Sequence, residues 1–101
     1  MWMMVMFDLP VTEPEERKRA TAFRNFLLND GFEMSQFSVY FRFCGTREQA
    51  LPFVKRIRSN APQDGKISIL FFTDKQFGDI ITICNRKPVL MHETPDQLTL
   101  F

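Results

Sequence analysis

The sequence is poor in the residues from which metal and redox centres are usually built. It has 2 cysteines, Cys44 and Cys84, and 1 histidine, His92, among 101 residues. Structural zinc sites take about four closely spaced Cys or His ligands, so this composition argues against a zinc site. Each cysteine stands in an apolar run, and the two are far apart in sequence. We therefore expect two free, half-buried strand thiols rather than a disulfide.

Glycine is also scarce, and no long apolar run is present. The 4 glycines are scattered, so the chain has neither a glycine-rich phosphate loop nor a Gly-x-Ser-x-Gly nucleophile motif. A membrane span needs about 20 apolar residues, whereas the apolar start of the chain stops at Asp8 and Pro10. The same interruption argues against a signal peptide. We expect a soluble, cytoplasmic protein without a membrane partner.

Charge is nearly balanced overall but unevenly distributed. The 13 Lys and Arg residues against 12 Asp and Glu residues give a net charge of +1, which does not by itself indicate a nucleic-acid partner. Residues 42–87, however, hold nine basic and four acidic residues, a net of +5. Arg56 and Arg58 in this stretch are candidates for contact with a duplex backbone. Because the RNP1 pattern is missing, binding should follow shape and charge rather than base sequence.

Phenylalanine, by contrast, is abundant. The chain is 45% hydrophobic and 25% charged, with 12 phenylalanines. These fractions are close to the globular average, and a length of 101 residues leaves room for one domain, over residues 1–101. The phenylalanines predict an aromatic-rich core, or a surface that a partner covers.

Hydrophobic periodicity predicts alternating strands and helices. Strands are expected at 2–8, 34–44, 67–73, 79–84 and 98–101, helices at about 14–29 and 47–59, a turn at 74–78 and a polar loop at 85–95. Thr12 to Glu15 has the spacing of a capping box, Gly31 ends the first helix, and Pro52 either begins or kinks the second. The order β-α-β-α-β-β is a variant of the split βαβ theme, so we expect a two-layer α+β sandwich.

The same periodicity assigns side chains to faces. The first helix buries one apolar face, made by Ala20, Phe23, Phe26 and Leu27. The second helix does the same with Ala50, Phe53, Val54 and Ile57. If 34–44 is one strand, Phe37, Val39, Phe41 and Phe43 oppose Gln36, Ser38, Tyr40 and Arg42.

The apolar tail Leu98-Thr99-Leu100-Phe101 is unsuited to exposure in solvent. A segment of this kind adds to an exposed sheet edge, in its own chain or in a neighbour. We favour the neighbour, because the preceding residues are numerous enough to reach across. Leu98, Leu100 and Phe101 would then join two copies, and much of the phenylalanine excess would lie in a homodimer interface.

Asp8, at the end of the first strand and before Leu9-Pro10, is the candidate catalytic and metal-binding residue. One carboxylate is too few for a catalytic magnesium ion, which takes about one or two carboxylates together with water and phosphate. In a two-fold dimer, two copies of Asp8 would share one Mg²⁺ that polarises a phosphodiester or activates water. The alternative is that Asp8 caps a turn.

Three arginines of the first helix are candidates for phosphate contact near Asp8. Arg17 and Arg24 point away from the apolar face, whereas Arg19 lies at its edge and should lean toward the core and the end of the first strand. The alternative is a solvated helix face, paired in part with Glu13, Glu15 and Glu16.

Taken together, these segments resemble the CRISPR-associated protein family Cas2. The resemblance rests on Val5-Met6-Phe7-Asp8-Leu9-Pro10, Glu15-Glu16-Arg17-Lys18, Phe26-Leu27-Leu28, Gly31-Phe32 and Met34-Ser35-Gln36-Phe37-Ser38-Val39-Tyr40. It covers essentially the whole chain. The stretch Thr73-Asp74-Lys75-Gln76-Phe77 is similar to the branch found in type II systems.

The resemblance implies a ferredoxin-like β-α-β-β-α-β fold with an extra C-terminal strand that lies on the partner of a homodimer. It implies work with the Cas1 integrase in spacer acquisition, where the dimer sits between two integrase dimers and holds a DNA duplex. Some members also cleave RNA or DNA with magnesium at the aspartate that matches Asp8. Arg17, Arg19 and Tyr40 match nucleic-acid-binding positions of the family.

Four functions therefore stay open. The leading one is a double-stranded-DNA-binding scaffold that bridges integrase dimers. The second is a magnesium-dependent endonuclease acting at paired Asp8. A related RNase toxin without an integrase, and a dimeric regulator with a small-molecule site, are the others.

Overall fold

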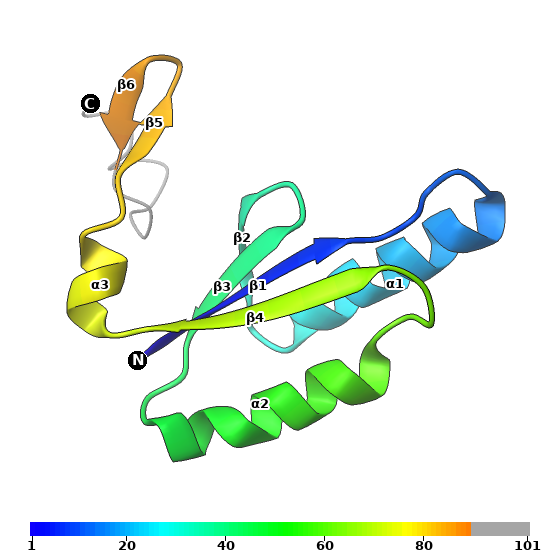
Figure 1. The fold of residues 1–101 in the computed structure, drawn as a ribbon, viewed down its shortest axis with the longest axis horizontal. Helices are drawn as coiled ribbons and strands as arrows, with labels where there is room; N and C mark the ends of the chain where they lie inside the picture. Colours follow the sequence, from blue (N-terminus) through cyan, green and yellow to red (C-terminus); the bar gives the residue numbers. More distant parts are fainter. Residues whose placement is uncertain (90–101) are drawn as a thin grey trace.

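The structure is a computed structural model that describes residues 1–89. Its elements are β1 (Trp2–Asp8), α1 (Pro14–Asn29), β2 (Glu33–Gln36), β3 (Val39–Phe43), α2 (Arg47–Asn60), β4 (Lys66–Phe72), α3 (Asp74–Gly78), β5 (Thr82–Cys84) and β6 (Lys87–Val89) (Figure 1). The expected strand at 98–101 and His92 lie outside the described residues. No helix within residues 1–89 has the length and apolarity needed to cross a membrane.

The first six elements form a ferredoxin-like α+β unit, as predicted. The sheet is antiparallel, with strand order β2-β3-β1-β4. Val5, in the central strand β1, lies opposite Tyr40 of β3 and Ile69 of β4. Because β1 is hydrogen-bonded on both sides, its apolar residues form the centre of the domain.

Both long helices pack on one face of this sheet. Alternation along β1 directs Met3 and Val5 toward the helices, and both are fully buried. The predicted inner faces of the helices are confirmed apart from Ala20, which is half-buried outside this core. The helices supply core residues that cluster with Met3 and Val5: Phe23, Phe26 and Leu27 from α1, and Ala50, Phe53, Val54 and Ile57 from α2.

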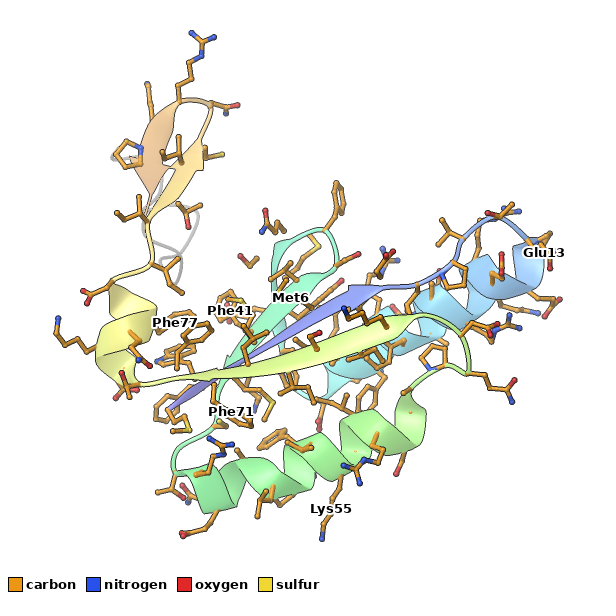
Figure 2. The ribbon with its side chains drawn as sticks, viewed as in Figure 1. Met6, Glu13, Phe41, Lys55, Phe71 and Phe77 are labelled. Atoms are coloured by element: carbon orange, nitrogen blue, oxygen red, sulfur yellow. The ribbon has the colours of Figure 1, made fainter. Side chains whose placement is uncertain are left out.

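The opposite face of the sheet, called here the open sheet face, is apolar but carries neither α1 nor α2. It is formed by Trp2, Met4, Met6, Val39, Phe41, Phe43, Leu70 and Phe72. Within residues 1–89, only the short helix α3 covers one end of it, through the buried Phe77. In Figure 2, Phe71 lies between β4 and α2, whereas Met6, Phe41 and Phe77 lie on the other side of β4. Met6 and Phe43 are 42% and 50% exposed.

The prediction of a single strand over 34–44 is wrong, because the segment folds into the β2–β3 hairpin. Phe37 and Ser38 form the turn, and Ser38 has a left-handed backbone with φ 66°. Because the turn has two residues, the apolar residues still alternate with period 2 across it. The turn also lacks the glycine or asparagine that usually indicates a hairpin. Phe37 is consequently 87% exposed instead of facing the sheet with Val39.

The prediction for residues 74–95 also needs correction. The expected turn at 74–78 is the helix α3, and the expected strand at 79–84 shortens to β5. Among the described strands, β5 pairs only with β6, which lies in the expected polar loop. The two form a hairpin apart from the main sheet (Figure 1). Asn85 and Arg86 both have positive φ, as a type I′ turn requires.

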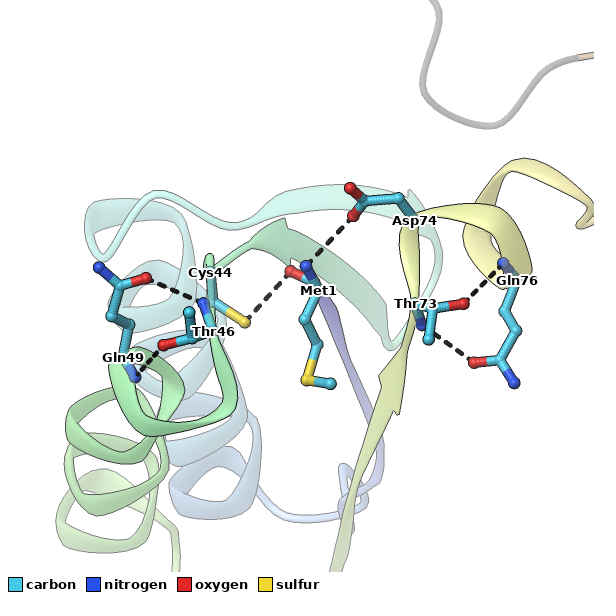
Figure 3. Close-up of polar contacts among 7 residues, drawn as sticks. All are labelled: Met1, Cys44, Thr46, Gln49, Thr73, Asp74 and Gln76. Carbon is cyan, nitrogen blue, oxygen red and sulfur yellow. Dashed lines mark hydrogen bonds and ion pairs between the residues drawn. The ribbon is translucent and has the colours of Figure 1, made fainter.

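The helix starts are set by local hydrogen bonds. At α2, Gln49 N donates to Thr46 Oγ1 at 3.2 Å and Thr46 N donates to Gln49 Oε1 at 2.9 Å; Thr73 and Gln76 repeat this pattern at α3 (Figure 3). The Thr46 cap places Pro52 inside α2 instead of at its start. At α1 the box lies one residue later than predicted, since Glu13 N donates to Glu16 Oε1 at 2.8 Å.

The two cysteines differ in environment. Cys44 is buried, and its thiol donates to the Met1 carbonyl oxygen at 3.4 Å (Figure 3). Cys84 is exposed on β5, and Cys44 follows the last residue of β3, so the expected half-burial is wrong for both cysteines. Both are free thiols, as predicted.

Candidate nucleic-acid interface

Asp8 is the last residue of β1 and belongs to the open sheet face. Strand alternation places it on the same side as Met4 and Met6, in register with Lys66 of β4. The residue is exposed, and its side chain makes no hydrogen bond or ion pair with any residue from 1 to 89. The carboxylate is therefore available to a ligand that approaches from this face.

The donors around Asp8 bear on the magnesium expectation. Carboxylate oxygens suit Mg²⁺, but residues 1–89 contain no group of three or more His, Cys, Asp or Glu side chains arranged to hold a metal ion. The described residues of one chain thus supply the right kind of ligand at Asp8 but too few carboxylates. A second Asp8, contributed by a two-fold partner, would meet the usual carboxylate requirement.

Arg17, Arg24 and Tyr40 are brought together at one cavity, called here the α1–turn cavity. It has a volume of about 300 Å³ and lies between α1 and the β2–β3 turn. The side chains that line it include Phe7, Arg17, Thr21, Arg24, Phe37 and Tyr40. Residues from the first helix and the hairpin thus converge, and of the positions matched by the resemblance Arg17 and Tyr40 are among them.

Arg17 acts within this cavity as a support for the chain before α1. Its Nη1 donates to the Thr12 carbonyl oxygen at 2.8 Å and to the Val11 carbonyl oxygen at 3.3 Å. These bonds anchor the loop that leads into the helix, and Val11 is part of the cavity wall. One guanidinium nitrogen of Arg17 is therefore already used by the protein.

Tyr40 forms the inner wall of the cavity. The residue is 1% exposed, and its ring stacks on Phe7 with the ring centroids 5.7 Å apart. Burial raises the pKa of the Tyr40 phenol, and the positive charge of Arg24 opposes this effect only in part. The hydroxyl accordingly keeps its proton at neutral pH and can donate to a ligand.

Arg19 is separate from that cavity. It does not lean into the core: its side chain is exposed, and Nη2 lies 3.7 Å from Asp64 Oδ2 in the loop before β4. Arg19 does lie beside Leu9 and Pro10, so its expected position near the end of the first strand is correct. An exposed ion pair of this length contributes little to stability, about 0–1 kcal/mol.

Arg56 and Arg58 do not form one continuous strip of positive charge along α2. Arg56 Nε lies 3.2 Å from Asp30 Oδ1, and its guanidinium is 4.5 Å from the centre of the Phe53 ring. Arg58 is exposed, and two residues along a helix turn the side chain through about 200°. Arg56 therefore links α2 to the end of α1, while Arg58 presents its charge on another side.

Sequence reasoning missed two features of this surface. Phe37 lines the cavity and is largely exposed because of the tight turn, and Thr21 of α1 adds a hydroxyl to the lining. Arg86, one of the nine basic residues counted in 42–87, is exposed at the turn of the β5–β6 hairpin. The Phe37–Ser38 turn could not be found from the pattern, because the turn does not interrupt the apolar alternation.

Comparison with known proteins gives a consistent result. A family model described as "CRISPR associated protein Cas2" matches residues 1–80. Proteins named "CRISPR-associated endoribonuclease Cas2" are similar over the whole chain. The protein of Flavobacterium psychrophilum is 48% identical, and the match covers 88% of its length. The protein of Paracidovorax avenae is 48% identical, and the match covers 94% of its length. That of Parvibaculum lavamentivorans is 44% identical and is covered to 100%.

Proposed function

This chain belongs to the CRISPR-associated protein Cas2 family, and from that premise we propose that it is a homodimeric scaffold for CRISPR adaptation. In this role it holds double-stranded DNA and bridges Cas1 integrase dimers during spacer acquisition. The observation that carries the proposal is the open sheet face. A scaffold needs a rigid platform that pairs with a second copy, and this face supports such a platform.

The argument for a dimer starts from apolar exposure. Met6 and Phe43 are about half exposed and lie beside Val39, Phe41 and Leu70. Monomeric proteins rarely leave a continuous apolar patch larger than about a few hundred Å² in water. If this face packed against the same face of a second copy, these side chains would be removed from solvent in a self-complementary, two-fold interface.

The argument for DNA rests on exposed positive charge on the two long helices and at the hairpin turn. Arg24 on α1, Arg58 on α2 and Arg86 at the hairpin turn are exposed, and none has an ion-pair partner among residues 1–89. Such arginines are free to neutralise phosphates. Two copies would present the set twice, which suits a duplex longer than one subunit.

The decisive experiment is an integration assay with the cognate Cas1 integrase, a short DNA duplex and a plasmid that carries the repeat. Integration should require this chain and should persist with Asp8→Ala, because a scaffold does not need that carboxylate. Glu48→Gln, which alters an exposed carboxylate on α2, is the matched control. Integration that proceeds equally without this chain would refute the scaffold function.

A second function, metal-dependent phosphodiester hydrolysis, is favoured by the position of Asp8. Asp8 is on the open sheet face, so a two-fold axis near the end of β1 would bring two copies of it together. Three relatives that match the whole chain are named endoribonucleases. A magnesium ion held by the paired carboxylates would supply charge stabilisation at a phosphodiester. Asp8 would hold the ion, and Lys66 would add positive charge beside it.

The two functions differ in their response to one substitution. If the chain is an endonuclease, Asp8→Asn should lower the rate of RNA or DNA cleavage by about three orders of magnitude or more, since it removes an essential charge. Cleavage is measured with labelled strands at fixed magnesium, with Glu48→Gln as the control. Unchanged cleavage by a dimeric Asp8→Asn protein would remove this second function.

A further inference from the structure

The α1–turn cavity has a partly apolar wall, to which Phe7, Val11, Ala20 and Phe37 contribute. Its other lining side chains carry hydrogen-bond donors, and its described lining has no carboxylate. Arg24 projects from α1 and Tyr40 from β3, and Thr21 of α1 also lines the cavity. Guanidinium and hydroxyl donors around a hollow of this kind select an oxyanion, and phosphate is the oxyanion that Arg binds best.

Two of these donors have no partner in the described part of the chain. Arg24 has no ion pair or hydrogen bond with any residue from 1 to 89, and the same holds for the Tyr40 hydroxyl. Tyr40 is nonetheless almost completely buried, so the side chain has little freedom to turn elsewhere. The hydroxyl is not among the enclosed polar atoms of residues 1–89 and Tyr40 lines the cavity, so the hydroxyl can donate to a ligand that enters there.

An aromatic ring stands beside these donors. Phe37 is 87% exposed and lines the same cavity, while Phe7 packs against Tyr40 behind it. An exposed aromatic ring next to cations is the arrangement on which proteins stack unpaired bases. The volume, about 300 Å³, is at the lower end of the range for small-molecule sites, roughly 300–1,000 Å³, so it suits one nucleotide.

We infer that the α1–turn cavity binds a single unpaired nucleotide, with its phosphate at Arg24 and Tyr40 and its base against Phe37. Arg17 is a positioning residue in this site, because it anchors the backbone of Val11 and Thr12. A base inside a duplex is stacked and paired, so the ligand is a free mononucleotide or the unpaired end of a strand. This inference deepens the proposed function and rests on it for the choice of nucleic acid as ligand.

The test is isothermal titration calorimetry with a nucleoside 5′-monophosphate, the matching nucleoside and inorganic phosphate. The monophosphate should bind more tightly than either of its parts. Arg24→Ala should weaken its binding about tenfold, because a charge-assisted hydrogen bond is lost. Phe37→Ala should also weaken it about tenfold through lost stacking, and Tyr40→Phe about fivefold through the loss of one hydroxyl donor.

Lys18→Ala is the matched control, because it removes one positive charge from the same helix without touching the cavity. A second arm compares a blunt duplex with a duplex that carries one unpaired nucleotide. Tighter binding of the overhang, lost in Phe37→Ala, identifies a strand end as the ligand; equal binding of the two duplexes identifies the free mononucleotide.

Two results would overturn the inference. One is the absence of monophosphate binding at millimolar concentration by wild-type protein. The other is equal weakening by Lys18→Ala and Arg24→Ala, which would indicate general electrostatic attraction only. Either result, with integration still dependent on this chain, would leave the scaffold function standing. If the monophosphate binds in the cavity but integration proceeds without this chain, the scaffold function is refuted and the nucleotide site stands.

Discussion

Trp2 of β1 and Phe77 of α3 stack with their ring centroids 4.1 Å apart and their planes 5° apart. Phe77 also lies 5.3 Å from the ring centre of Phe41, so one side chain from a five-residue helix closes an end of the open sheet face. The sequence of α3 had suggested only a turn. Its Thr73–Gln76 capping box and the buried Phe77 explain why it forms a helix at that place.

Removal of the Phe77 ring should destabilise the domain strongly. Phe77 is 2% exposed, and Phe77→Ala should lower the free energy of unfolding by about 3–5 kcal/mol through lost burial and cavity formation. Urea denaturation followed by Trp2 fluorescence measures the change. Phe37→Ala is the matched control, because Phe37 is largely exposed and its loss should cost less than about 0.5 kcal/mol. Equal costs for the two variants would contradict the packing described for α3.

Introduction of charge on the open sheet face should prevent dimer formation. Met6→Asp places a carboxylate at the centre of that face, and burial of an unpaired charge is strongly unfavourable. Analytical ultracentrifugation should show a dimer for the wild type and a monomer for Met6→Asp. Leu28→Asp, on the exposed side of α1, should leave the wild-type state unchanged. If Met6→Asp stays dimeric, the interface lies elsewhere.

Tyr40 should ionise above its ordinary pKa of 10.0 in the folded protein. Burial raises this pKa, and the Arg24 guanidinium lowers it in part. Because the neutral phenol is favoured in the folded state, its contribution to stability is fully present below pH 10.0 and is lost as the pH rises through the folded pKa. Tyr40 is the only tyrosine, so ultraviolet absorbance reports it directly. Arg24→Ala should raise the pKa further; a lower value in that variant would contradict the contact.

The two cysteines should differ in reactivity. Cys84 is exposed, whereas Cys44 is 6% exposed and burial raises its pKa, despite the opposing positive charges of the N-terminal amine and Arg42. Thiolate is the reactive form, so native-state labelling with a disulfide reagent should modify Cys84 at least about tenfold faster. Cys84→Ser should abolish the fast phase and Cys44→Ser the slow one. Equal rates would contradict the buried position of Cys44.

Much of the fold was predictable because its signals are local. The apolar run of β1, the inner faces of the long helices and Gly31 after α1 are read from neighbouring residues. The hairpin at Phe37–Ser38 was missed, since two turn residues preserve the alternation that marks a strand. The pairing of β5 with β6 was missed because apolar residues such as Ile83, 69% exposed, look like core residues in a sequence pattern.

For the candidate site, sequence by itself determined which residues carry chemistry: Asp8 at a strand end, arginines on the first helix and Tyr40 in the Gln-Phe-Ser-Val-Tyr segment. Tertiary structure decided their grouping. Arg24 and Tyr40 line one cavity, whereas Arg19 forms an ion pair with Asp64 and Arg56 forms one with Asp30. The reason is physical: periodicity along one element fixes which face a side chain occupies, whereas its neighbours across elements depend on turns and packing that periodicity does not encode.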